Sequence, residues 1–287
     1  MTVGIGVLCD AMYNQGPTIV LAVDDKGTYG GRSLTANEAC GKFYDTLPTA
    51  PLGIAVSGNL STCESVVAEF STQLKTFRKQ QENDGDVLYC DHVRVAIREA
   101  RQYEYGMFFE EELRGLLGMS RSEWLVETNP EKKRKGWKVA RAARLNFPVW
   151  LIVGGFLRRD FVLMRSSGAC VTQVGVGPFA AGIGWQPALN QLHTRKQDNY
   201  HSVPRTLLHV AEAMDQARLA FPNSIGRPAD YLVLRPEEPM MRFSRDSPVL
   251  KAWLAQFARK DSQPMQTDPS FRKEFEEELQ EHRSVNR

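Results

Sequence analysis

Thr2 is the residue whose type and position are most suggestive of chemistry. Thr2 is small, so removal of Met1 is plausible. Thr2 then presents a hydroxyl and a free α-amino group on adjacent atoms. The hydroxyl is a weak nucleophile that needs a base. An α-amino group has a pKa of about 7.7–8.0, which suits a base at neutral pH. Thr2 is therefore a candidate nucleophile that carries its own base, the alternative being that a Met-Thr start carries no chemistry.

Motifs for other chemistries are missing from the sequence. There is no G-x-S-x-G, no P-loop and no H-E-x-x-H motif, and the five histidines have no metal-ligand spacing. Gly175 to Ala180 fits G-x-G-x-x-A, but a predicted hairpin precedes it, whereas a dinucleotide site requires a β-α-β unit. We interpret this run as a turn into a helix, and we expect neither a cofactor nor a metal.

The composition is that of a globular protein, with 42% hydrophobic and 24% charged residues. The net charge of +2 creates no field that would attract a polyanion. The longest apolar run, 147–157, is shorter than the roughly 20 residues that a membrane span needs, and no signal peptide is evident. The five cysteines are odd in number and widely spaced, which favours free thiols and a cytoplasmic location.

Blocks of strands and helices alternate along the chain. The patterns predict a hairpin of 3–9 and 18–24, a strand at 51–57, helices from Ser61 and from Asp91, a hairpin of 149–156 and 160–165, a helical stretch after 177, a helix from Ser202, and a strand at 230–234. Ser61 with Glu64 fits a capping box. Parallel doubly wound folds alternate strand and helix, so this order favours antiparallel sheets with helices outside them.

A basic segment interrupts this pattern at about 118–147, where seven lysines and arginines lie close to Trp124 and Trp137. It could be a nucleic-acid patch or a solvated insertion. We favour the insertion because no nucleic-acid-binding motif surrounds it, and nucleic acid is not an expected partner. We divide the chain into a domain at 2–235 that contains this insertion and a helical tail at 236–287.

Several short motifs, in order, resemble proteasome β-type subunits. They are Thr2-Val3-Gly4-Ile5, the run 19–24 ending in Asp24, Thr28, Lys42 at a strand start, 54–58 before a capped helix, 151–155, 175–179 as a helix start, and Asp215 late in a helix. Asn223 to Asp230 is similar to a run of the ancestral β-subunit group. The resemblance covers about residues 2–235.

This resemblance implies an α+β fold, a four-layer αββα sandwich of an N-terminal nucleophile (Ntn) hydrolase. It implies that Thr2 is the nucleophile, with Lys42 lowering the pKa of its amine and Asp24 pairing with Lys42. The backbone N–H of Gly58 would stabilise the oxyanion, and Asp215 would support the site. Read without the resemblance, Asp24 could be a turn residue, Lys42 could lie on a solvated strand edge, and Asp215 could pair with Arg218.

The implied activity is that of a threonine endopeptidase in a homo-oligomeric ring that cleaves peptides or unfolded proteins. An ATP-dependent unfoldase could feed such a ring, and no membrane partner is expected. Two positions depart from the family pattern, because Val176 and Arg218 stand where serines are usual. These departures favour an alternative, a catalytically inactive scaffold subunit. A non-proteolytic amidohydrolase of the same superfamily is a further alternative.

Overall fold

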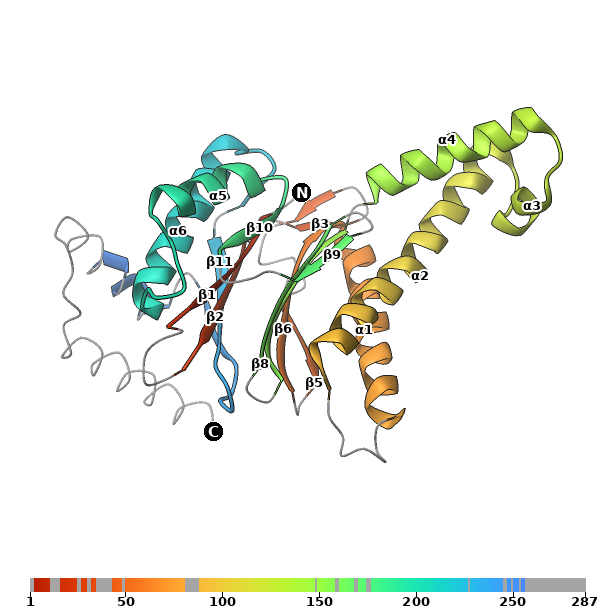
Figure 1. The fold of residues 1–287 in the computed structure, drawn as a ribbon. Helices are drawn as coiled ribbons and strands as arrows, with labels where there is room; N and C mark the ends of the chain where they lie inside the picture. The colour runs from red at the N-terminus through yellow and green to blue at the C-terminus, as the bar shows by residue number, and fades with distance from the viewer. Residues whose placement is uncertain are drawn as a thin grey trace.

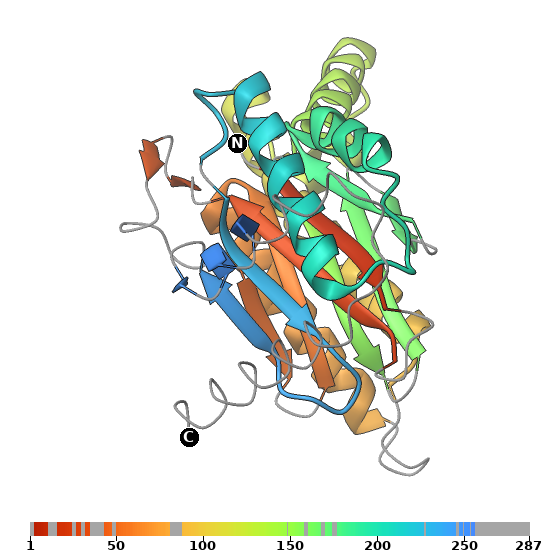
Figure 2. The same cartoon turned by 90° about the vertical axis from the view of Figure 1, so that its left-hand side faces the viewer.

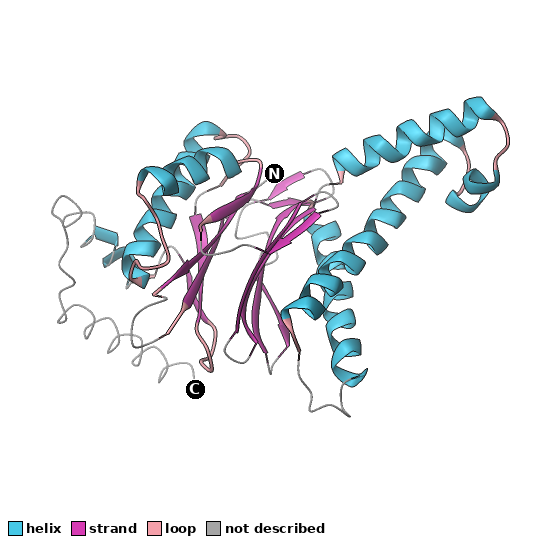
Figure 3. Cartoon of the chain, viewed as in Figure 1, coloured by secondary structure: helices cyan, strands magenta, loops and turns pink. Residues whose placement is uncertain are grey.

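The structure is a computed structural model whose described residues form two five-stranded sheets, one two-stranded pair and several helices (Figure 3). It describes residues 3–10, 16–24, 27–29, 32–34, 43–47, 50–80, 88–147, 149–157, 160–167, 170–173, 177–226, 228–244, 247–248, 250–252 and 254–255. Among these residues, no helix has both the length and the apolar character to cross a membrane.

The first sheet has five antiparallel strands in the order β10-β1-β2-β11-β12. These strands are β1 (Val3–Cys9), β2 (Thr18–Asp24), β10 (Phe179–Gly182), β11 (Pro228–Leu234) and β12 (Met241–Ser244). The predicted first hairpin is confirmed, because β1 pairs with β2 from Gly4 opposite Val23 to Cys9 opposite Thr18. Both strands are buried along their whole length, as their nearly continuous apolar sequence requires.

The second sheet also has five antiparallel strands, in the order β5-β6-β7-β8-β9. They are β5 (Phe43–Leu47), β6 (Ala50–Gly58), β7 (Val149–Leu157), β8 (Asp160–Ser167) and β9 (Cys170–Gln173). The predicted hairpin of β7 and β8 is confirmed. A separate pair, β3 (Gly27–Tyr29) and β4 (Arg32–Leu34), lies beside the sheets.

Helices cover one face of each sheet, and the remaining two faces pack on each other (Figure 1). Helices α5 (Trp185–Thr194) and α6 (Val203–Ala220) lie on the first sheet, as Figure 2 shows. Helices α1 (Leu60–Gln80) and the first half of α2 (Cys90–Leu117) lie on the second. Between the sheets, side chains such as Leu21 and Ile152 form a shared apolar cluster. The expected α+β class with antiparallel sheets is therefore correct.

The second half of α2 leaves the sheets and forms, with α3 (Arg121–Val126) and α4 (Pro130–Asn146), an arm that projects from the body (Figure 1). We use the name arm for residues 102–146. A small apolar core of its own holds the arm together, comprising Phe109, Leu113, Met119, Trp124, Val139 and Ala143. The arm contains the segment expected as a basic insertion, and it places that segment on helices.

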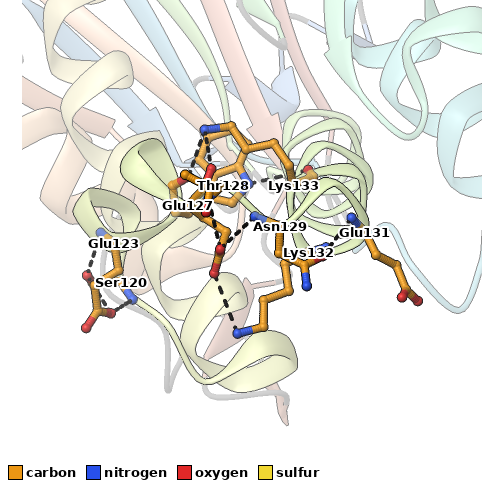
Figure 4. A network of polar contacts seen from close by, with 9 residues as sticks. Ser120, Glu123, Glu127, Thr128, Asn129, Glu131, Lys132 and Lys133 are labelled. Atoms are coloured by element: carbon orange, nitrogen blue, oxygen red, sulfur yellow. Dashed lines mark hydrogen bonds and ion pairs between the residues drawn. The ribbon is translucent and has the colours of Figure 1, made fainter.

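Polar contacts close the tip of the arm (Figure 4). Ser120 and Glu123 form a capping box at the start of α3, and the Asn129 side chain accepts a hydrogen bond from the Glu131 N–H at the start of α4. The Lys133 ammonium donates to the carbonyl oxygens of Trp124 and Leu125 at 3.1 and 2.7 Å. These bonds satisfy helix ends that have no partner within the helix itself.

Three local predictions differ from the structure. Helix α1 begins at Leu60, so the cap is Asn59, whose side chain accepts from Ser61 and Thr62, and not the predicted box at Ser61. Residues 179–182 form β10 and not a helix, because pairing with β1 outweighs the weak helical preference of a four-residue run. Strand β12 lies within the predicted tail and extends the first sheet beside β11.

Candidate functional site

The ends of strands from both sheets meet at one edge of the molecule. Val3 begins β1 opposite Gly182, and Asp24 ends β2. Gly4 approaches the second sheet, where a Cβ on Gly4 would lie 3.3 Å from Cδ1 of Ile152. Ile152 of β7 pairs with Ala55 of β6, and Gly58 ends β6 three residues later. The end of β6 therefore lies at the same edge as the start of β1. We call this region the strand-end site.

Asp24 is the central polar residue of the strand-end site. Its side chain is only 1% exposed. One carboxylate oxygen accepts a hydrogen bond from the backbone N–H of Val3 at 3.1 Å, and the other accepts from that of Gly226 at 2.9 Å. Burying a carboxylate is costly unless hydrogen bonds compensate it. Asp24 therefore ties the start of the chain to the loop that precedes β11.

Close packing fixes the position of Val3. Gly184, just before α5, lies so close that a Cβ there would be 3.3 Å from Cβ of Val3 and 2.9 Å from Cβ of Ala217. The same Cβ would be 2.3 Å from Cδ1 of Ile225. A residue larger than glycine at 184 would displace these neighbours. The start of β1, the start of α5 and the end of α6 are thus held together.

Gly58 ends β6 with a φ of +134°, a backbone conformation that side chains rarely allow. It pairs with Val149 at the start of β7. The carbonyl oxygen of Val149 accepts a hydrogen bond of 2.7 Å from the guanidinium of Arg101, a buried residue of α2. The base of the arm is therefore anchored one strand away from Gly58.

Two of the predicted site residues, Thr2 and Lys42, lie outside the described residues. Val3 follows Thr2 directly in the sequence, so the contact of Asp24 with the Val3 N–H is the described contact nearest to the candidate nucleophile. Val176, at one of the two departures from the family pattern, also lies outside the described residues.

Asp215 lies on α6 and is partly exposed. Its carboxylate is 3.5 Å from the guanidinium of Arg218, three residues later on the same helix. This is the pairing that the sequence left open as the alternative role of Asp215. The described contacts link α6 to Val3 through Ala217 and Gly184, whereas Asp24 and Asp215 share no described contact.

Cys9 and Cys90 are not primed as nucleophiles. Burial raises the pKa of Cys9 far above its usual range, and the neighbouring Asp10 charge adds to this effect. Burial also raises the pKa of Cys90. Since the thiolate is the reactive form, these thiols are poor nucleophiles. The described part of the chain also holds no cluster of three side chains suited to binding a metal ion.

Sequence reasoning missed three residues that build this site, namely Gly226, Gly184 and Arg101. Gly226 stands in the run Asn223 to Asp230, but its N–H reaches Asp24 across 202 positions, which no local pattern reveals. Gly184 follows a four-residue strand that was expected to be helical. Arg101 carries a sequence signal, because it interrupts the apolar face of α2 at a buried position.

Solved structures with similar folds are known. Anbu (ancestral beta-subunit) from Yersinia bercovieri matches with a TM-score of 0.58 and 14% identity, over 93% of this chain and 100% of that chain. The Gly-1 mutant of Anbu from Hyphomicrobium sp. strain MC1 matches with a TM-score of 0.55 and 13% identity, with the same coverage.

The protein has an Anbu-like fold. At these identities the likeness is one of fold, and it is a proteasome-like fold in the sense of an ancestral β-subunit. No protein-family model and no curated protein sequence matches the chain. The resemblance that short motifs indicated is therefore supported at the level of the fold.

Proposed function

We propose that the protein is a threonine-type peptidase subunit in which Thr2, exposed by removal of Met1, is the N-terminal nucleophile. The observation that carries this proposal is the buried carboxylate of Asp24, which accepts a hydrogen bond from the backbone N–H of Val3. This contact holds the residue next to Thr2 in place. A nucleophile held in a fixed geometry reacts far faster than a free one.

In the proposed mechanism, the Thr2 hydroxyl attacks a peptide carbonyl while the Thr2 amine takes up the proton. The carbonyl oxygen becomes an oxyanion that accepts a hydrogen bond from the N–H of Gly58, a kind of contact worth about 2.7–4 kcal/mol. Collapse of this tetrahedral intermediate breaks the peptide C–N bond. The leaving amine takes up the proton from the Thr2 ammonium, and the acyl part stays on Thr2 as an ester. Water then hydrolyses this ester and regenerates the hydroxyl.

Lys42 is assigned the role of lowering the pKa of the amine, and Asp24 that of balancing the Lys42 charge. A cation about 4 Å from the amine would disfavour its protonated form by roughly 4 kcal/mol at an effective dielectric constant of 20. Asp215 would support the site from α6. The helix–sheet–sheet–helix packing order supports the αββα sandwich of Ntn hydrolases as the fold in which these residues act.

The second candidate function is that of a catalytically inactive scaffold subunit. A specific observation favours it, since Asp215 already pairs with Arg218, where the related pattern has a serine. An arginine cannot replace the short hydroxyl of a serine as a hydrogen-bonding group. A non-proteolytic amidohydrolase remains a third reading, in which Thr2 attacks an amide other than a peptide bond.

The partners proposed with this function are a peptide or unfolded protein as substrate, further copies of the chain in a ring, and an ATP-dependent unfoldase. A ring would enclose the strand-end sites and admit only unfolded chains. The proposal includes neither a nucleic acid nor a membrane as a partner.

Intact mass is the first test of the proposal. Retained Met1 in the purified protein would block the amine and overturn the peptidase mechanism. If Met1 is absent, a fluorogenic peptide should be cleaved and an epoxyketone should form a covalent adduct with Thr2.

The Thr2→Ala variant should lose both the cleavage and the adduct, and Lys42→Ala should lose cleavage while remaining folded by circular dichroism. Undiminished cleavage in Thr2→Ala would refute the assignment of the nucleophile. A Met1-free protein that forms no adduct and cleaves no peptide would support the scaffold, and turnover of small amides alone would support the amidohydrolase.

A further inference from the structure

The outer face of α4 carries a row of positive charges. Arg134, Lys138 and Arg141 follow each other at i, i+4 and i+7, so they lie on one side of the helix. All three are exposed, and none has an ion-pair partner among the described residues. Trp137 stands beside this row with 62% of its surface exposed. We call Arg134, Lys138 and Arg141 the basic stripe.

Other cations of α4 have local roles, which sets the basic stripe apart. The ammonium of Lys132 lies 3.5 Å from the Glu127 carboxylate, and that of Lys135 lies 3.3 Å from the Glu131 carboxylate. Lys133 binds carbonyl oxygens at the end of α3. The basic stripe, with Arg144 further along α4, has no ion pair among the described residues.

A complementary group of negative charges lies on α1 and α2. Glu104 and Glu111 are seven residues apart on α2 and share one side of that helix, and the charges of Glu111 and of Glu69 on α1 both act on Glu104. Burial raises the pKa of Glu104, and the charges of Glu69 and Glu111 raise it further. Met107 and Tyr103, both at least half exposed, flank this group. We call Glu69, Glu104 and Glu111 the acidic stripe.

The acidic stripe and the arm core lie on opposite sides of α2. Glu111 lies two residues from Phe109 and two from Leu113, both buried in the arm core. Two residues correspond to a rotation of about 200° around a helix, so Glu111 points away from α4.

The same spacing holds on α4. Arg141 lies two residues from Val139 and two from Ala143, the residues that pack on α2. The basic stripe therefore points away from α2. Because the two stripes face in opposite directions, they cannot pair within one chain.

We propose that the basic stripe of one copy of this chain binds the acidic stripe of a second copy. Glu104 and Glu111 are separated by the same seven residues as Arg134 and Arg141, about 10 Å along a helix, so the charges match in spacing as well as in sign. Each stripe has exposed apolar neighbours that contact can bury, and tryptophan is enriched among residues that dominate binding energy.

The predicted interface joins two different surfaces, so a bound pair leaves the acidic stripe of one copy and the basic stripe of the other open. Such a head-to-tail contact produces a closed ring or an open helical array. The contact does not involve the strand-end site, so it stands whether or not Thr2 is catalytic. A nucleic acid is a weaker candidate for the basic stripe, because it would leave the repulsion within the acidic stripe uncompensated.

Two full-length charge-reversal variants test the proposal. The first carries Arg134→Glu, Lys138→Glu and Arg141→Glu, and the second carries Glu104→Lys and Glu111→Lys. In sedimentation velocity at about 0.05 M salt, wild type should associate, and each variant alone should associate at least about tenfold more weakly. An equal mixture of the two should associate again, because the reversed stripes complement each other. Raising the salt to about 0.5 M should dissociate wild type.

Arg94→Glu is the matched control, because Arg94 is an exposed α2 arginine outside both stripes that already pairs with Asp91. It should associate as wild type does. A wild type that is monomeric at low salt, or variants that associate unchanged, would overturn the proposal. So would a mixture that stays monomeric although both variants are folded. Binding of a labelled oligonucleotide that the first variant loses, without any change in association, would assign the basic stripe to nucleic acid instead.

Discussion

The strand-end site and the arm use charge in opposite ways. At the strand-end site one carboxylate, Asp24, is almost fully buried, and backbone N–H groups from distant parts of the chain hold it. On the arm, charges such as Arg141 and Glu111 are exposed and lack ion-pair partners among the described residues. A buried charge fixes geometry inside one molecule, whereas an exposed row of charges is available to another molecule. This contrast separates the proposed chemistry from the proposed assembly.

The largest expected effect comes from removing the buried carboxylate. Asp24→Ala leaves the N–H groups of Val3 and Gly226 without their acceptor, and each buried unsatisfied group costs about 1–3 kcal/mol. We expect a loss of about 3 kcal/mol in the free energy of unfolding, measured by urea denaturation. Asp91→Ala, which removes an exposed carboxylate, should cost under about 1 kcal/mol. Equal losses of unfolding free energy in both variants would contradict the distinction between a buried and an exposed carboxylate.

A smaller effect is expected in the core of the arm. A Cβ on Gly136 would lie 1.9 Å from Nε1 of Trp124, so Gly136→Ala must displace the indole. The overpacking costs about 1–3 kcal/mol, partly offset by the roughly 1 kcal/mol that alanine contributes to a helix. We expect Gly136→Ala to change the tryptophan fluorescence but not the urea midpoint at which the sheets unfold. This result would show that the arm responds separately from the sheets. An unchanged fluorescence spectrum would contradict this packing.

The smallest expected effect concerns Glu104. Because its pKa in the folded protein is raised, stability falls as the pH rises from the unfolded-state pKa to that raised pKa, and the loss is complete above it. Glu104→Gln should therefore be slightly more stable than wild type at neutral pH, by less than about 1 kcal/mol for this partly exposed group. The difference should vanish as the pH falls below about 4.3, where the wild-type carboxyl is neutral in both states. Urea midpoints at the two pH values measure this, and a less stable variant at neutral pH would contradict the expected sign.

Where the chain forms its regular elements was largely predictable from the sequence. The hairpins of β1 with β2 and of β7 with β8 follow from continuous apolar runs separated by turn residues. The apolar spacing likewise predicts α1, α2 and α6. The failures include short elements such as β10, where four residues carry too little periodic signal to distinguish a strand from a helix. They also include α4, a helix of 17 residues whose sequence was interpreted only as a basic insertion.

The sequence by itself determined which residues are candidates, including Asp24 at the end of an apolar strand and the cations of α4. Only the tertiary structure decided that Asp24 meets Gly226, that Arg101 holds the start of β7, and that the basic and acidic stripes face apart. These features depend on the register between strands and on which helix faces pack together. Register and packing bring together residues far apart in the chain, and local patterns do not record such contacts.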